Sequence, residues 1–329
     1  IECITENTIL RKIVPQVIEP NGGLFIALDE SDLHYGEAFI ESCQICNIPI
    51  EEMKPERALR LEPNINPKLL TAFLIPDGTF DPLRLALAFA ATARKNGAKF
   101  RTYTEAKNLI TNGKGNVIGV NLLDLKSGKT SDLHADIVVN ATGAWAGEIV
   151  ETVGVKVPVK PTPGVMVAFE QRFIQRTVNR LNKPGDGDIV LPQRRMAVVG
   201  TTSFEIDNPD YVPVLDEHVK LMIERGAQLI PAIASAKVRG KYMATRPLIG
   251  GGEGRSVART FKCYDHKEMH SLDGLVTITG GKATTLRAMA ETTADLVCAK
   301  LGMNAPCTTR ETPLLSYRQY YMQPNEDLL

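Results

Sequence analysis

The chain has 329 residues, of which 43% are hydrophobic and 23% are charged, so it has enough apolar material for about two domain cores. Its 38 basic and 38 acidic residues give a formal net charge of +0, which argues against nucleic acid as a partner. No run of 18 apolar residues occurs, so no membrane-spanning helix is predicted. The first residues are polar and begin without methionine, and we expect the chain to be part of something longer.

The first half of the chain predicts helices separated by short strands. A loose spacing of apolar residues at intervals of three and four predicts an amphipathic helix over residues 2–18. An N-cap at Asp29 or Ser31 starts a second helix, and an Asp-Pro pair starts a third over residues 82–97. A short helix is expected at 53–63, and strands are expected at 21–28, 69–76, 99–103, 106–111 and 116–123.

The second half is richer in predicted strands. The apolar run Ile137 to Val139 predicts a strand that is buried on both faces of a parallel sheet. Residues 155–204 are mostly β, residues 216–230 predict a helix, and the polar tail after Pro313 is expected to be loosely ordered. The order of elements predicts an α/β fold whose long β-rich insertion makes two interleaved domains.

The cysteines and histidines give weak signals. Cys43 and Cys46 form a C-x-x-C within a predicted helix, and we expect two reduced thiols, with metal or redox use as the alternative. The five histidines lack metal-ligand spacing, so no metal site is predicted. His266, in "YDHKE", is the one candidate for a catalytic base, and a solvated loop histidine is the other interpretation.

Two glycine-containing turns follow predicted strands and precede predicted helices. They are "NATGAWA" at 140–146 and "TGGKATTL" at 279–286. Backbone N–H groups at a helix start attract anions, glycines allow close approach of a ligand, and Lys282 adds a positive charge. Two such turns favour a dinucleotide, although strand-to-helix turns are also rich in small residues for steric reasons. The usual G-x-G-x-x-G after a strand is missing, and "GGGEGR" at 250–255 indicates a surface loop.

Several motifs occur in one order over nearly the whole chain. With this set, the sequence resembles FAD-dependent glycerol-3-phosphate dehydrogenases of the glycine oxidase/D-amino-acid oxidase-like group, and most of all the anaerobic A-subunit branch. The motifs are "ECITENTILRKI", "NGGLFIAL", "PDGTFDPLRL", "ADIVVNATGAWA", "VGTTSFEID", "TRPLIG", "DGLVTITGGKATTLRAMAE" and "VCAKLGMNAPCTT".

The resemblance implies a fold and a domain division. An FAD-binding Rossmann-like parallel sheet, without its first βαβ unit, is expected to be interleaved with a β-rich substrate domain. The family's N-terminal glycine fingerprint and the branch's C-terminal cysteine-rich module have no counterpart here, so we expect this chain alone to hold FAD poorly. The incomplete FAD-binding domain is expected at 1–20, 76–154 and 264–305, the substrate domain at 21–75 and 155–263, and a tail at 306–329.

The resemblance also implies a reaction and its residues. Hydride would pass from C2 of sn-glycerol 3-phosphate to flavin N5, giving dihydroxyacetone phosphate. Arg246 of "TRPL" resembles the family's substrate-phosphate arginine, Arg259 of "SVART" resembles a second active-site arginine, and Lys282 would stabilise charge on the reduced flavin. A surface ion pair is the alternative for either arginine. The residues expected to contact FAD are Ala141, Thr142, Gly143, Trp145, Gly280, Gly281, Lys282, Ala283 and Thr284.

Some of these expectations have open alternatives. Ala283 and Leu286 depart from the larger residues usual in the family, and Trp145 is equally compatible with a place in the core. Reduced thiols fit a cytoplasmic location. The resemblance further implies a quinone acceptor reached through membrane-associated electron-transfer subunits, at the inner membrane face. The competing functions are an oxidase of the same fold acting on an amino acid or amine, and a non-catalytic fragment without flavin.

Overall fold

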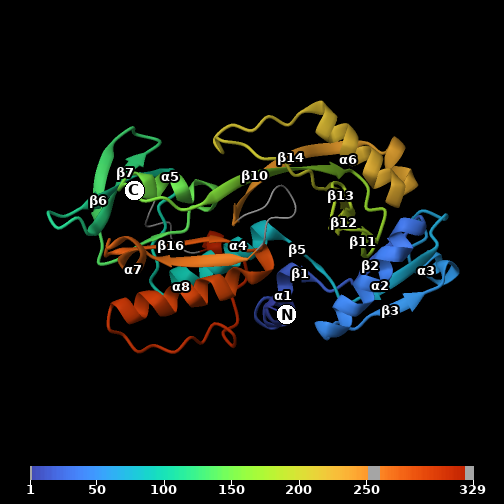
Figure 1. Cartoon of the computed structure of the whole chain (residues 1–329), viewed down its shortest axis with the longest axis horizontal. Coiled ribbons are helices and arrows are strands. Elements are labelled where there is room, and N and C mark those ends of the chain that lie inside the picture. The colour runs from blue at the N-terminus through green and yellow to red at the C-terminus, as the bar shows by residue number, and fades with distance from the viewer. Residues whose placement is uncertain (1, 251–259, 323–329) are drawn as a thin grey trace. The chain divides into compact units, whose positions relative to one another are not determined.

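The computed structural model describes residues 2–250 and 260–322, which form a mixed α/β fold, as predicted (Figure 1). The chain divides into two compact units. We call the first the large-sheet unit, which comprises Pro15–Pro82 and Pro163–Thr245. We call the second the two-sheet unit, which comprises Glu2–Val14, Leu83–Thr162 and Arg246–Leu329. The expected assignment of an FAD-binding and a substrate domain stays a prediction.

The large-sheet unit is built on an eight-stranded sheet of order β14-β10-β13-β12-β11-β2-β4-β3. Strands β2 and β11 are parallel, with Val178 opposite Leu24, and β12 and β13 are antiparallel to each other. The strands are β2 (Gly23–Ala27), β3 (Glu51–Met53), β4 (Thr71–Ile75), β10 (Val159–Phe169), β11 (Thr177–Arg180), β12 (Ile189–Gln193), β13 (Met196–Gly200) and β14 (Val238–Ile249). A two-stranded ribbon pairs β1 (Ile18–Glu19) with β5 (Thr79–Phe80).

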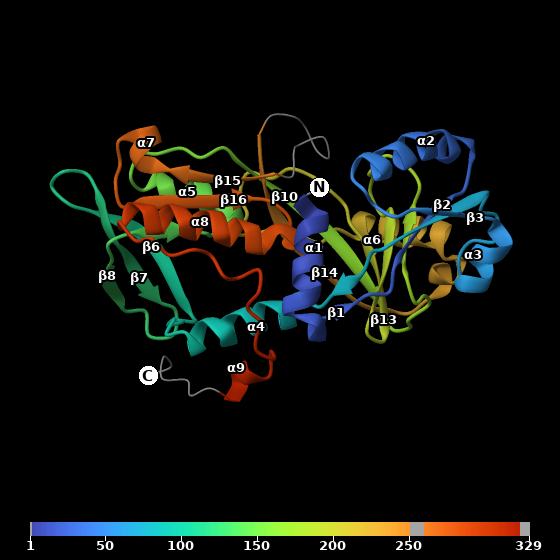
Figure 2. The ribbon, with the colours of Figure 1, turned by 90° about the horizontal axis from the view of Figure 1, so that it is seen from below.

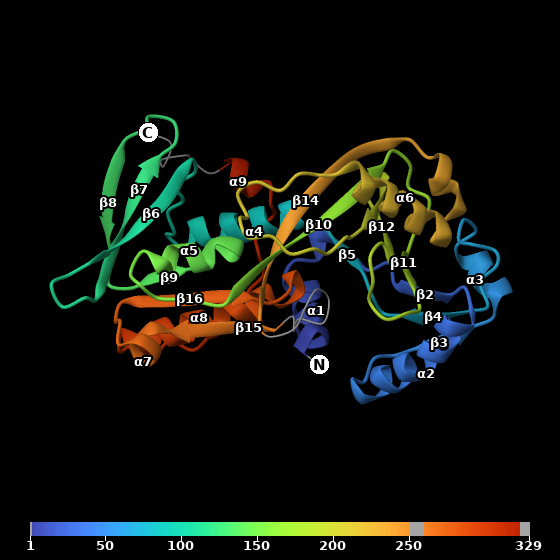
Figure 3. The same cartoon turned by 45° about the horizontal axis from the view of Figure 1, so that its top comes forward.

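Both faces of the large sheet are covered because its central strands carry apolar residues on both sides. Leu24 and Ile26 are fully buried in the main core, together with Met222 of a helix that packs on β11, β12 and β13 (Figure 3). Phe25 points to the opposite face, where its ring lies 4.6 Å from that of Phe39. The helices are α2 (Glu30–Ile45), α3 (Pro55–Leu61) and α6 (Asp216–Leu229), with short turns η1 (Pro15–Val17) and η3 (Pro231–Ser235).

The two-sheet unit holds two three-stranded sheets, of order β15-β16-β9 and β6-β7-β8. In the first, β9 and β16 are parallel, with Asn140 opposite Thr277, and β15 is antiparallel to β16. The strands are β6 (Thr104–Thr111), β7 (Val117–Asp124), β8 (Thr130–His134), β9 (Val138–Asn140), β15 (Phe261–Asp265) and β16 (Leu275–Gly280).

Helices cover the sheet that contains β16, and α8 lies along β15 and β16 (Figure 2). A core of valines and leucines, with Leu275 fully buried at its centre, joins this sheet to the helix that follows β9. The helices are α1 (Glu2–Ile13), α4 (Pro82–Lys95), α5 (Ala146–Glu151), α7 (His266–His270), α8 (Leu286–Lys300) and α9 (Gln319–Met322), with turns η2 (Gly143–Trp145) and η5 (Ala283–Thr285). Every described helix is too short or too polar to cross a membrane.

Two of the predicted strands differ from the structure. Residues 99–103 form no strand, because the chain turns at Tyr103, whose φ is +55°, and β6 begins only at Thr104. Strand β9 does form, but the side chain of Val139 is 42% exposed. The prediction of burial on both faces is therefore wrong, since β9 stands at the edge of its sheet.

The C-terminal tail is better held than the sequence suggested. The Leu314 N–H donates to the carbonyl of Ile13 at 2.8 Å, and the Leu315 N–H donates to Thr92 Oγ1 at 2.9 Å. The guanidinium of Arg94 stacks on the Tyr320 ring at 4.4 Å. The expectation of a loosely ordered tail is thus wrong as far as Met322, because α1 and α4 anchor it.

Candidate functional site

The candidate site lies at one edge of the β15-β16-β9 sheet. Because β9 and β16 are parallel, their carboxyl ends meet at the same edge, and each is followed by a turn into a helix. Ligands of open α/β sheets bind at this edge. The two glycine-containing turns, residues 141–145 and 280–284, are therefore brought to one place, although more than 130 residues separate them.

The glycines of the second turn are required by the chain's own packing. Gly280 and Gly281 have φ of +82° and +78°, where side chains are disfavoured. A Cβ on Gly280 would lie 2.4 Å from the carbonyl oxygen of Thr260, and one on Gly281 would lie 2.5 Å from Met289 Sδ. The steric interpretation thus accounts for both glycines, and a cofactor contact there stays a prediction.

Gly143, in the first turn, is different. Its φ is +65°, yet a Cβ built on it meets no described atom within 4 Å. The residues around it are also accessible, because Ala141 and Thr142 are exposed. Trp145 is 40% exposed, which excludes the alternative that it fills the core. This turn therefore leaves open space beside its backbone.

The start of α8 offers hydrogen-bond donors and a positive charge. Its N-cap residue, Thr285, makes no side-chain capping bond to α8; its hydroxyl donates to the carbonyl of Lys282 at 3.0 Å and accepts the Lys282 N–H at 3.2 Å. The 15-residue helix directs its positive dipole end to this edge. Ala283 is exposed and Thr284 is half-buried. The hydroxyl of Thr279 is buried without a hydrogen-bond partner among the described residues.

Lys282 is exposed, and its Nζ lies 3.7 Å from Cys3 Sγ in α1. The thiol accepts a weak hydrogen bond from the ammonium group. The charge of Lys282 is therefore accessible to solvent at this turn.

Arg246 lies on β14 and belongs to the two-sheet unit. Its Nη1 donates to the carbonyl oxygen of Thr162 at 3.3 Å. Three residues later in the strand, Ile249 packs against Gly280, since a Cβ there would lie 3.0 Å from Ile249 Cδ1. Arg246 is about 10 Å along the strand from Ile249, the residue that contacts the second glycine turn. Arg259 and the sequence 251–255 lie outside the described residues.

A buried ion-pair network behind the site was missed by the sequence analysis. Arg287 in α8 is 1% exposed, and it donates to both carboxylate oxygens of Glu6 in α1, at 2.8 and 2.6 Å. It also contacts Glu291 at 2.6 Å, which is the one pair that the i,i+4 spacing could have indicated. The hydrogen bonds that Arg287 donates to the Glu6 carboxylate raise the pKa of Arg287. These pairs fix α1 to the first turn of α8.

His266 is the clearest correction to the sequence analysis. It is fully buried as the first residue of α7, so the interpretation as a solvated loop histidine is wrong. Both of its ring nitrogens have partners, Thr277 Oγ1 at 2.8 Å and His270 Nδ1 at 3.1 Å. Burial, reinforced by His270, lowers its pKa from 6.5 to about 4. It is therefore neutral at pH 7 and is not a base within reach of a substrate.

The six cysteines are free, with Cys43 buried in α2 and Cys46 at its C-terminal end. Burial raises the pKa of the Cys43 thiol, which fits the expected reduced pair. Among the described residues, no cluster of three histidine, cysteine or acidic side chains has the arrangement of a metal site.

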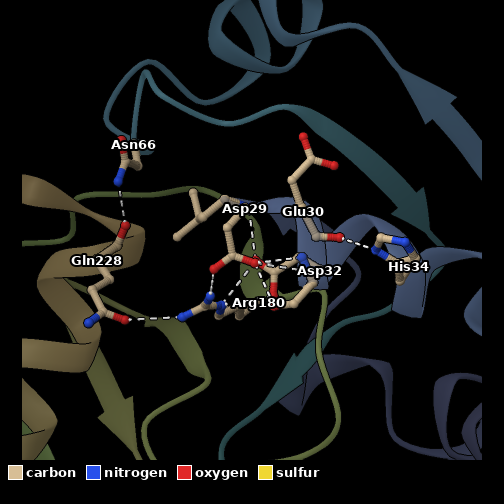
Figure 4. Close-up of polar contacts among 9 residues, drawn as sticks. Asp29, Glu30, Asp32, His34, Asn66, Arg180 and Gln228 are labelled. Carbon is tan, nitrogen blue, oxygen red and sulfur yellow. Dashed lines mark hydrogen bonds and ion pairs between the residues drawn. The ribbon is translucent and has the colours of Figure 1, made fainter.

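The large-sheet unit has a similar parallel pair, β2 and β11, but side chains of the protein pair with one another at its edge. Arg180, the last residue of β11, donates through Nε to both Asp32 oxygens at 3.1 and 3.0 Å and through Nη2 to Asp29 at 2.5 Å (Figure 4). Asp29 caps α2 by accepting the N–H groups of Ser31 and Asp32. These hydrogen bonds, with that of the Ser31 hydroxyl first, lower the pKa of Asp29.

Fold and site together define an α/β protein whose open sheet edge, at two glycine-containing turns, suits a nucleotide. The chain belongs to the family described as FAD dependent oxidoreductase, whose model matches residues 8–296. It is 40% identical, over 100% of its own length and 59% of the relative's, to a Haemophilus influenzae protein named as the A subunit of anaerobic glycerol-3-phosphate dehydrogenase. The Escherichia coli protein of the same name is also 40% identical, over 95% of this chain and 58% of that protein.

Solved structures agree on the fold. A glycerol-3-phosphate dehydrogenase from Bacillus halodurans, complexed with FAD, superimposes with a TM-score of 0.75 at 24% identity, over 95% of this chain and 58% of that one. An L-proline dehydrogenase from P. horikoshii gives 0.73 at 20% identity, over 91% and 78%. The chain therefore has the fold of these oxidoreductases, and it spans less than two thirds of the two curated relatives named above.

Proposed function

We propose that the protein carrying this chain oxidises sn-glycerol 3-phosphate to dihydroxyacetone phosphate, with FAD as the hydride acceptor. The observation that carries the proposal is the 40% identity, over the full length of the chain, to a protein named as the A subunit of anaerobic glycerol-3-phosphate dehydrogenase. The meeting of the two glycine-containing turns at one sheet edge supports the same function. Because the chain matches only 59% of that relative, the activity is proposed for the whole protein.

The proposed FAD site is the edge formed by residues 141–145 and 280–284. Three features fit the group: open space beside Gly143, the uncapped start of α8, and the unpartnered hydroxyl of Thr279 among the described residues. When bound, FAD supplies N5 as the hydride acceptor. The dipole of α8 and the charge of Lys282 favour electron density near this edge, whereas the six-residue α5 has too short a dipole to add much.

The proposed substrate residues are cationic, because the substrate carries a phosphate. The guanidinium of Arg246 is planar and can bind two phosphate oxygens at once. Arg259, outside the described residues, is proposed as a second phosphate ligand. Lys282 is proposed to hold negative charge on the reacting side.

The proposed partners follow from the relatives' names. Both relatives are named as the A subunit of their enzyme, which implies further subunits in those proteins. We infer that this protein also passes its electrons to partner subunits and on to a quinone, at the inner face of the cytoplasmic membrane. A pull-down that recovers no partner protein from native membranes would contradict this part of the proposal.

The test of the phosphate assignment uses the full-length protein and a dye as electron acceptor. Arg246→Ala is expected to raise the KM for glycerol 3-phosphate by about 10- to 100-fold, since a charge-assisted hydrogen bond contributes about 1.5–3 kcal/mol. Arg239→Ala is the matched control, because Arg239 is exposed on the same strand. An unchanged KM and rate in Arg246→Ala would show the assignment to be wrong.

The same assay separates the alternatives. An oxidase for amino acids or amines would reduce the dye with glycine or proline and not with glycerol 3-phosphate. A preparation of the full-length protein without a flavin absorbance band would indicate a non-catalytic protein.

A further inference from the structure

We propose that Thr277 and His266 are positioning residues that set, through Asn140, the shape of the loop 141–146. The proposal rests on the proposed function, since this loop carries four of the nine proposed FAD contacts. It concerns a continuous hydrogen-bonded chain in the two-sheet unit, Thr142–Asn140–Thr277–His266–His270, whose two end residues are exposed. The three central residues are at most 2% exposed.

Asn140 is held in one orientation by its backbone partners. The N–H of Thr142 lies 3.3 Å from Asn140 Oδ1, and only an oxygen can accept it. The carbonyl of Ala146 lies 2.9 Å from Asn140 Nδ2, and only an N–H can donate to it. The Thr142 hydroxyl adds a bond of 2.7 Å to Oδ1. The Asn140 side chain thus bridges the two ends of the loop, and its amide cannot be flipped without losing these bonds.

The orientation of Asn140 fixes the protons along the chain. Its Nδ2 donates to Thr277 Oγ1 at 3.4 Å, so the Thr277 hydroxyl proton is free to point to His266 Nε2, 2.8 Å away. His266 Nε2 is then an acceptor, and the ring proton sits on Nδ1. Nδ1 donates to His270 Nδ1 at 3.1 Å. Asn140, Thr277 and His266 each donate to the next residue in the series, and the Nδ1–H tautomer of neutral His266 satisfies this direction.

The surroundings of His266 keep this arrangement. Tyr264 stacks on its ring with centroids 6.3 Å apart, and His270 does so at 5.0 Å. Asp265 and Lys300 pair with each other at 2.9 Å, so their charges largely offset one another near the ring. A second proton on His266 would place an N–H against the Thr277 hydroxyl, whose own proton would lose its acceptor. This series of hydrogen bonds is therefore complete only while His266 is neutral.

The first arm of the experiment reads the proton positions directly. In a ¹⁵N-histidine NMR spectrum of this chain near pH 7, His266 is expected as the neutral Nδ1–H tautomer, with the assignment given by the signal lost in His266→Gln. An Nε2–H tautomer, or a charged ring at this pH, overturns the proposal. This arm requires no FAD.

The second arm measures the dissociation constant for FAD in the full-length protein. Thr277→Val keeps the shape and removes the hydroxyl, and it is expected to weaken FAD binding about tenfold. Thr277→Ser keeps the hydroxyl and is expected to restore binding to within about twofold of the wild type. Equal affinities for the two variants overturn the positioning role.

The two arms distinguish a failure of the proposed function from a failure of the positioning role. A wild-type protein that binds no FAD overturns the proposed function, and the positioning role with it. Wild-type binding of FAD with equal Val and Ser variants leaves the proposed function standing and overturns only the positioning role. The expected tautomer together with tenfold weakening in Thr277→Val and rescue in Thr277→Ser supports both.

Discussion

Each unit of the molecule contains one described pair of parallel strands followed by a helix start, and the two edges have opposite properties. In the large-sheet unit, the start of α2 is capped by Asp29, and Arg180 forms ion pairs with Asp29 and the buried Asp32 (Figure 4). In the two-sheet unit, the start of α8 has no side-chain cap among the described residues, and Lys282 is exposed beside it. One helix start has a side-chain cap, and the other has none among the described residues.

The comparison teaches that strand topology alone does not make a binding site. The carboxyl edge of a parallel pair offers amide donors and a helix dipole, but side chains of the same protein can use them first. Sites are therefore found where these donors are left unused, and that depends on the few residues that follow each strand.

The ion pairs of Arg180 at the edge of the large-sheet unit should matter for stability and not for ligand binding. Arg180→Met leaves the carboxylate of Asp32, 1% exposed, without its cation, and is expected to lower the free energy of unfolding by about 3–5 kcal/mol. Urea unfolding measures the loss, with the exposed Arg239→Met as control. The FAD affinity of the folded full-length variant should stay at the wild-type value, and a large loss would contradict the division of roles between the edges.

Within the edge of the β9 and β16 pair, Gly280 and Gly143 should differ in how much an alanine substitution lowers stability. Gly280→Ala forces a Cβ into positive φ and onto the Thr260 carbonyl, and is expected to cost about 2–4 kcal/mol of stability. Gly143→Ala meets no described neighbour, so only the backbone penalty of about 1–2 kcal/mol remains. Thermal unfolding ranks the two variants. The reverse order would contradict the open space beside Gly143.

The pH dependence of stability should report the buried histidine. The pKa of His266 is lowered to about 4 in the folded state, so between about pH 6.5 and pH 4 the unfolded chain binds the extra proton. Stability due to this residue is thus full above pH 6.5 and is lost as the pH falls, by about 2 kcal/mol at pH 5. Urea unfolding from pH 8 to 5 measures it. His266→Gln should flatten this part of the profile, and an equal slope would contradict the burial of a neutral ring.

Much of the open edge could be predicted from the sequence. Apolar, β-branched residues at 275–279 followed by Gly-Gly-Lys and a helix-forming stretch gave β16, its turn and the start of α8 correctly, because these signals are local. The Asp-Pro pair at 81–82 located the start of α4 for the same reason.

The remainder could not be predicted because it depends on contacts distant in the sequence. Glu6 pairs with Arg287 across 281 residues, and no spacing rule connects them. Val139 is exposed because β9 is an edge strand, which an apolar run does not reveal. The burial of His266 depends on Thr277 and Tyr264, from two other strand positions, so a polar local sequence suggested a loop.

The smallest effect on stability is expected at Lys282. Its side chain is exposed, so Lys282→Met should change the free energy of unfolding by no more than about 0.5 kcal/mol. Because its charge is proposed to act on the ligand, the rate of dye reduction by the full-length protein should fall by more than about tenfold, as one lost electrostatic contact at a reacting centre predicts. Glu-to-Gln exchange at the exposed Glu268 serves as a control for general charge effects. A stable variant with the wild-type rate would remove Lys282 from the chemistry.

The central claim is that the edge of the β9 and β16 pair binds FAD, whereas the edge of the β2 and β11 pair does not. Hydrogen–deuterium exchange of the full-length protein, with and without FAD, tests both edges in one measurement. We expect FAD to slow exchange at the amides of residues 141–146 and 281–286 and to leave residues 28–34 unchanged. Protection at 28–34, or none at the two glycine-containing turns in a protein that binds FAD, would contradict the claim.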